Sequence, residues 1–84
     1  MTVQSFTGTI NTNGEFAEVS ELTDVTFSSG TTYNMQIQNV AYLKVGDAVF
    51  CFNNEKFDYK ASSDTLYIKT ATGSACELTI LEVE

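Results

Sequence analysis

Paired carboxylates are the side chains that this sequence offers first for catalysis. Two Asp or Glu residues can hydrolyse a glycosidic bond, and Asp58 with Asp64, or Asp58 with Glu77, supplies such a pair. A site of this kind also needs a deep cleft that holds one acid in apolar surroundings. Because 84 residues leave little material for the walls of a cleft, we expect no catalysis from these carboxylates.

Other catalytic and metal-binding residues are scarce. The sequence has no histidine, which is the commonest general base and metal ligand. Two cysteines without a C-x-x-C pair do not form a standard structural zinc site. The oxygens of Asn53, Asn54 and Glu55 suit calcium, but a solvated hairpin turn is the simpler interpretation of this stretch. We therefore predict that the protein is not an enzyme and has no metal or cofactor.

The two cysteines follow the alternation of their neighbours. Cys51 is in period-two phase with Val49, and Cys76 is in phase with Leu78 and Ile80. Free cysteine is among the most buried residue types, so we predict that both are small buried apolar residues. The sequence does not decide whether the two cysteines form a disulfide, although a cytosolic setting would keep the thiols reduced.

Aromatic side chains gather in the second half of the chain. Exposed tyrosines at strand ends can stack on sugars or anchor a protein interface, and Tyr42, Tyr59 and Tyr67 are the candidates. A domain this small first needs its aromatic residues for its core.

One predicted strand is apolar on both of its faces. Phe50 and Phe52 alternate with Val49 and Cys51, so the two phenylalanines fall on the opposite face. A strand of this kind needs a cover on each side, and a neighbouring subunit is a natural cover where no spare helix exists. Phe50 and Phe52 are therefore candidate interface residues.

The elements around these residues are predicted to be strands, because apolar residues recur with period two and Thr, Val, Ile, Phe and Tyr are plentiful. Turn residues separate the runs at short intervals. The predicted strands are Val3 to Ile10, Thr32 to Val40, Ala41 to Val45, Ala48 to Phe52, Phe57 to Lys60, Thr65 to Thr70 and Ala75 to Val83. The spacing predicts an all-β fold, a small antiparallel β-sandwich or jelly-roll-like barrel of about seven or eight short strands, with residues 1–84 as one domain.

The stretch from Glu15 to Asp24 does not follow this pattern. Acidic residues stand at positions 15, 18, 21 and 24 and apolar residues at 16, 19, 22 and 25, a three-residue spacing. This spacing suits a short helical turn, and it equally suits an acidic edge or loop.

The net charge of −7 limits the range of partners. It repels phosphate backbones and anionic lipid, so we expect neither nucleic-acid nor membrane binding. The N-terminal residues lack the basic start and apolar run of a signal peptide, so synthesis in the cytoplasm is expected. A domain of this size is only marginally stable by itself, and oligomerisation is one of the usual supplements.

Three runs resemble a pattern in small bacteriophage virion proteins of the capsid-decoration or head-fibre type. The runs are Tyr33 to Asn39, Asp64 to Lys69 and Glu77 to Glu82, and the resemblance covers about residues 32–84. It implies a β-sandwich with a structural role in the virion, no enzymatic activity, and several copies side by side. Gln36, Gln38 and Asn39 offer amide groups that suit an interface of such a domain.

Three functional hypotheses follow. The first is a non-enzymatic structural component of a phage particle that decorates the capsid or attaches a fibre. Its partners would be capsid or other virion proteins and further copies of itself, a trimer being one such arrangement. The second is a carbohydrate-binding module that uses Tyr42, Tyr59 and Tyr67 as stacking platforms. The third is a small acidic inhibitor whose negative face mimics nucleic acid.

Overall fold

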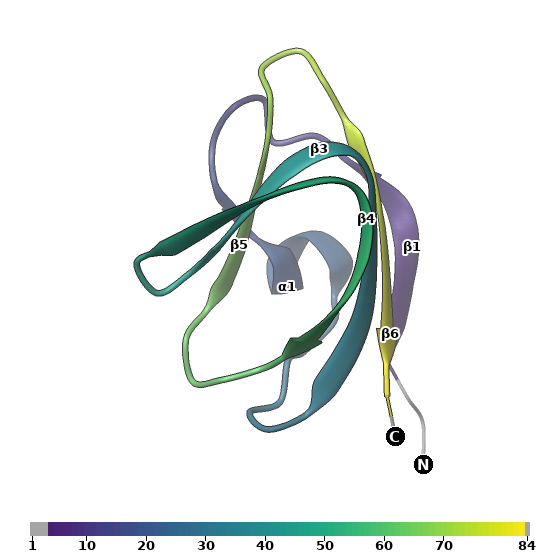
Figure 1. The fold of residues 1–84 in the computed structure, drawn as a ribbon, viewed down its shortest axis with the longest axis vertical. Coiled ribbons are helices and arrows are strands. Elements are labelled where there is room, and N and C mark those ends of the chain that lie inside the picture. Colours follow the sequence, from purple (N-terminus) through teal and green to yellow (C-terminus); the bar gives the residue numbers. More distant parts are fainter. Residues whose placement is uncertain (1–3, 84) are drawn as a thin grey trace.

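The computed structural model describes residues 4–83 as antiparallel strands and one short helix (Figure 1). The elements are β1 (Ser5–Ile10), β2 (Ala17–Glu18), α1 (Val19–Thr23), β3 (Thr32–Val45), β4 (Ala48–Lys60), β5 (Leu66–Thr70) and β6 (Cys76–Glu82). All six strands belong to one sheet, which curls into a half-barrel around α1. The prediction of an all-β fold is confirmed.

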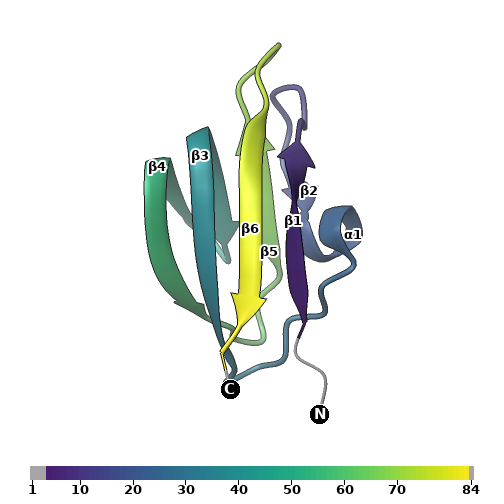
Figure 2. The same ribbon diagram turned by 90° about the vertical axis from the view of Figure 1, so that its right-hand side faces the viewer.

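The long hairpin of β3 and β4 is the centre of the sheet. On one side, β3 pairs with β4 from Thr32 to Val45. On its other side, β3 pairs first with β6 and then with β5, and the change falls between Gln38 and Ala41. The strands β1 and β2 extend the sheet beyond β6 and β5 respectively. Figure 2 shows β4, β3, β6 and β1 side by side, with β5 and β2 behind them.

The hairpin bends at a pair of asparagines. Asn39 in β3 has a φ of +72° and Asn54 in β4 a φ of +52°, and the pairing register shifts by one residue between Ile37 and Val40. The Asn39 backbone N–H donates to Asn54 Oδ1 at 2.8 Å, and Asn39 Nδ2 donates to the Ala75 carbonyl at 3.2 Å. Asparagine tolerates the left-handed conformation, and a bulge bends its strand, so these residues form the corner of the half-barrel.

This corner corrects two sequence predictions. Thr32 to Val40 and Ala41 to Val45 are not separate strands but the two arms of β3. Ala48 to Phe52 and Phe57 to Lys60 are likewise the two arms of β4, joined through residues 53–56 rather than separated by a turn. Residues 4–83 therefore form six strands, two of them long, instead of the predicted seven or eight short ones.

The other predicted strands are confirmed with small shifts at their ends. β1 begins at Ser5, and Val3 lies outside the described residues. β5 begins at Leu66 rather than Thr65, and β6 covers Cys76–Glu82 within the predicted range.

The concave face of the curled sheet holds the hydrophobic core. Alternate residues of a strand share a face of the sheet. Tyr33, Met35 and Ile37 of β3 therefore all point inward, where each is fully buried. Cys76, Leu78 and Ile80 of β6 are buried against them. The remaining buried apolar residues come from β1, α1, the second arm of β3, the segment after β4, β5 and the segment after α1: Ile10, Val19, Val25, Ala41, Leu43, Ala61, Leu66 and Ile68.

The acidic stretch forms a helical turn, which settles the alternative left open by its sequence. After two residues paired with β5, α1 runs from Val19 to Thr23 and ends at Asp24, whose φ is +60°. Val19 is fully buried and Val25 nearly so, whereas Glu21 is exposed. Of the apolar residues at this spacing, Val19 and Val25 therefore enter the core, whereas Leu22 is 40% exposed. Phe16 lies instead beside the Lys44 and Lys69 ammonium groups, 5.7 and 5.0 Å from its ring centroid.

Candidate interaction surface

The outer edge of β4 is the longest unpaired strand edge that the structure describes. Among residues 4–83, β4 pairs only with β3, although it runs over 13 residues. An unpaired edge presents backbone N–H and C=O groups that can pair with another chain. A long edge strand that is also apolar is a candidate site for protein association.

The first arm of β4 exposes apolar side chains on both of its faces, which confirms the prediction of a two-sided strand. Phe50 lies opposite Leu43 on the inner face and is 51% exposed, and Phe52 beside it is half-buried. Val49 lies on the outer face and is 53% exposed. No described element covers either face of this arm, so its apolar surface is available to a partner.

An apolar groove continues this surface across the concave face. It has a volume of about 270 Å³ and is lined by Leu43, Val45, Phe50, Phe52, Phe57, Asp58, Tyr59 and Leu66. The bend of β4 brings Phe52 and Phe57 together, and their rings stack with centroids 4.1 Å apart. Sequence reasoning missed most of this lining, because it depends on how the strands pair. The pairing of β3 with β4 places Leu43 opposite Phe50, and the pairing of β3 with β5 places Leu66 opposite Val45.

The three tyrosines proposed for sugar stacking lie on two different faces. Tyr42 and Tyr67 are on the outer face, opposite Lys69 and Lys44 respectively. Lys69 Nζ lies 5.0 Å from the Tyr42 ring centroid. Tyr59 is on the inner face opposite Tyr33, and its ring meets Phe27 edge-on. The structure therefore does not bring the three rings onto one platform.

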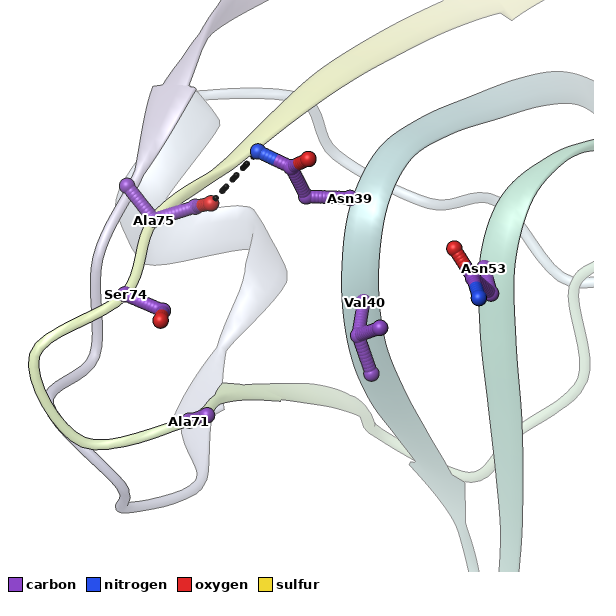
Figure 3. Close-up of a pocket in the computed structure, with 6 residues that line it drawn as sticks. All are labelled: Asn39, Val40, Asn53, Ala71, Ser74 and Ala75. Atoms are coloured by element: carbon purple, nitrogen blue, oxygen red, sulfur yellow. Dashed lines mark hydrogen bonds between the residues drawn. The ribbon is translucent and has the colours of Figure 1, made fainter.

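The amide candidates also separate. Gln36 and Gln38 lie on the outer face of the first arm of β3, opposite Thr79 and Glu77 of β6. Asn39 is committed to the corner through its bonds to Asn54 and Ala75. A shallow hollow of about 510 Å³ lies beside this corner, and Figure 3 shows the Asn39 amide turned toward the Ala75 carbonyl rather than into open space. Asn39 is therefore a structural residue of the bend.

The candidate carboxylates and calcium ligands are dispersed or already bonded. Asp58 accepts a hydrogen bond from Asn34 Nδ2 on the outer face, whereas Glu77 lies on β6, on the other side of β3. In the corner, Asn54 Oδ1 accepts the Asn39 N–H, and Glu55 Oε1 accepts the Asn53 N–H at 3.4 Å. Within residues 4–83 no three His, Cys, Asp or Glu side chains gather as metal ligands would.

The two cysteines differ in exposure, so the prediction that both are buried is wrong for Cys51. Cys76 is 1% exposed within the core, whereas Cys51 is exposed on the outer face of the β4 arm, and neither forms a disulfide. Cys51 is exposed because no described strand or helix packs on the outer face of this arm or pairs with its outer edge. Burial raises the pKa of the Cys76 thiol, which keeps it protonated and unreactive.

This difference predicts selective modification. A disulfide reagent such as dithiobis(nitrobenzoate) should titrate one thiol per chain in native buffer and two after unfolding in guanidinium chloride. The Cys51→Ser variant should lose the rapid native reaction, and Cys76→Ala should retain it. Equal rates for both thiols in the native chain would contradict the burial of Cys76.

In the part of the chain that the structure describes, no helix has the length and apolar character needed to cross a membrane.

Comparisons with known proteins define the fold and leave the family undetermined. No family model matches the chain, and no curated protein matches it significantly. Among solved structures, the chain is similar to the solution NMR structure of a de novo designed double-stranded β-helix, at 20% identity and a TM-score of 0.68. The match covers 95% of this chain and 99% of the designed one. The chain therefore has a double-stranded β-helix-like, jelly-roll-like fold, formed by a curled antiparallel sheet.

Proposed function

We propose that this chain is a non-enzymatic structural component of a bacteriophage particle, which decorates the capsid or attaches a fibre. The contact would be made by the β4 surface, that is, the apolar arm of β4 around Val49, Phe50 and Phe52. The observation that carries the proposal is the first arm of β4, which is apolar on both faces and lies at an unpaired sheet edge. Such a surface suits permanent burial against another protein, because exposed apolar edges otherwise promote aggregation.

The place of the protein in a virion rests on the resemblance of three sequence runs to phage decoration and head-fibre proteins. A jelly-roll-like fold is compatible with this role, although a fold alone does not define a function. The net charge of −7 supports a protein partner over nucleic acid or anionic lipid. Capsid or other virion proteins, together with further copies of the chain, are the partners that we propose.

A sedimentation experiment tests the proposal. Particles of the phage whose genome carries the gene would be assembled with the gene deleted, mixed with purified chain, and pelleted through sucrose. We expect the chain to pellet with the particles, because the apolar arm supplies the contact. Phe50→Asp should reduce the bound fraction at least tenfold, because it places an unpaired charge in that contact.

The matched control is Thr7→Asp, which adds the same charge at an exposed position of β1, away from the groove. It should bind like the unmodified chain. If the unmodified chain stays in the supernatant, and no copies of it are detected in particles assembled with the intact gene, the proposed function is wrong.

A further inference from the structure

We propose that the edge of β4 pairs with the β4 edge of a second copy of this chain, antiparallel and about a two-fold axis at the Asn54 corner. This inference deepens the proposed function by naming one partner at the β4 surface, and it rests on that function only for its biological setting. Its physical basis is the symmetry of β4 itself, since one edge meets an identical edge in such a dimer.

The first argument is the position of the bend. β4 extends six residues before Asn54 and six after it, so the corner is at the middle of the strand. In an antiparallel two-fold pair, the corners of the two copies lie within one residue of each other when Asn54 lies opposite Glu55 of the partner subunit. Both strands then bend at the same place and toward the same side, and the two half-barrels continue as one curled sheet.

The second argument is that the faces of the strands match in this register. On the inner face, Phe50 meets Tyr59 of the partner subunit, and Phe52 meets Phe57 of the partner subunit. This match depends on the corner, because the inner positions of β4 are even before Asn54 and odd after it. A shift of the register by one residue would place inner residues opposite outer ones, with Phe50 against Asp58 of the partner subunit.

The third argument is that this register brings no like charges together. In this register the outer positions set Val49 against Lys60 of the partner subunit and Cys51 against Asp58 of the partner subunit. No two like charges lie opposite each other along the arms, and like charges in that position would be destabilising. The lysine stem also covers the exposed face of Val49, since long charged side chains pack their apolar stems on such surfaces.

The groove supplies the fourth argument. Each copy has a stack of Phe52 on Phe57 with centroids 4.1 Å apart, and the two-fold pairing places the two stacks side by side. Together with Leu43 and Leu66, they form one apolar channel that is closed along the shared edge. A strand edge has a single row of unpaired groups, so one neighbour saturates it and the assembly closes as a dimer.

A designed disulfide tests the register. Directly opposite residues have Cβ atoms about 4.5–5.5 Å apart, so Asp58→Cys should place a new thiol against Cys51 of the partner subunit. Mild oxidation should then convert most of the chain into a dimer on non-reducing gels. Glu77→Cys is the matched control, because it puts an exposed thiol on β6 instead, and it should remain largely uncrosslinked.

Light scattering after size-exclusion chromatography gives the second measurement. The chain of 9.2 kDa should elute with twice that mass, and Phe50→Asp should elute as a folded monomer with an unchanged circular-dichroism spectrum. A monomer or a trimer for the unmodified chain would overturn the inference, as would a dimer in which Asp58→Cys does not crosslink.

These results are separable from the proposed function. A monomer that still sediments with particles leaves the virion role intact and removes only the dimer. A crosslinked dimer that never binds particles supports the pairing of β4 and removes the virion role.

Discussion

Replacing Tyr33 by alanine is expected to lower the free energy of unfolding by about 3–5 kcal/mol, the range found for deletion of a large buried aromatic side chain. Tyr33 is fully buried in the first arm of β3, and its ring meets Phe27 edge-on at 4.8 Å. Its hydroxyl accepts the Ser28 N–H at 2.8 Å and donates to the Thr26 carbonyl at 3.2 Å. Urea unfolding followed by circular dichroism measures the loss.

The Tyr33→Phe variant separates the hydroxyl from the ring. It keeps the ring in the core and removes only the two hydrogen bonds, so we expect a loss of about 1–3 kcal/mol. The hydroxyl holds the segment after α1 against β3. A loss for Tyr33→Ala no larger than that for Tyr33→Phe would show that the ring is not packed as described.

The second large effect is expected at the corner of the half-barrel. Asn39→Val places a β-branched residue at a φ of +72° and removes the hydrogen bond that the side-chain amide donates to the Ala75 carbonyl. The left-handed conformation costs about 1–2 kcal/mol for an ordinary residue, and the lost hydrogen bond adds about 1 kcal/mol. The free energy of unfolding should fall by about 2–3 kcal/mol, measured by the same urea titration.

Asn39→Gly is the matched control for this position. Glycine adopts positive φ without strain. The variant should therefore be destabilised only by the missing side-chain hydrogen bond and by the larger backbone entropy that glycine loses on folding. We expect a loss at least 1 kcal/mol smaller than that for Asn39→Val. Equal losses for valine and glycine would mean that the conformation of residue 39 does not determine the bend.

Local sequence patterns predict the strands of this fold better than its shape. The alternation of Tyr33, Met35 and Ile37 identifies the inner face because a half-buried strand has period two. The asparagines at 53 and 54 misled the prediction, because the same residues serve a hairpin turn and a bent strand. The distinction is made by the pairing with β3, which continues on both sides of the asparagines and sets Asn53 opposite Val40.

The candidate surface was predictable only in part. The alternation of Val49 and Phe50 predicts a strand that is apolar on both faces, and the structure shows both side chains exposed. The groove depends on Leu66 and Leu43 coming together through the pairing of β5 with β3, which no local pattern contains. The exposure of Cys51 follows from the place of its strand at the edge of the sheet, and strand order is likewise a property of the whole fold.

The pairing of β1 with β6 determines when the fold can close during synthesis. Ser5 lies opposite Leu81, so β1 can pair with β6 only after the chain has been synthesised as far as β6. The hairpin of β3 and β4 forms earlier from neighbouring residues, and it then presents its aromatic inner face without β6 to complete the core. Such non-local closure is slow, on the order of milliseconds to seconds for β-rich domains. The nascent chain therefore passes through a stage in which the unpaired edge and the open core are exposed together, and early capture of the hairpin by another chain competes with folding.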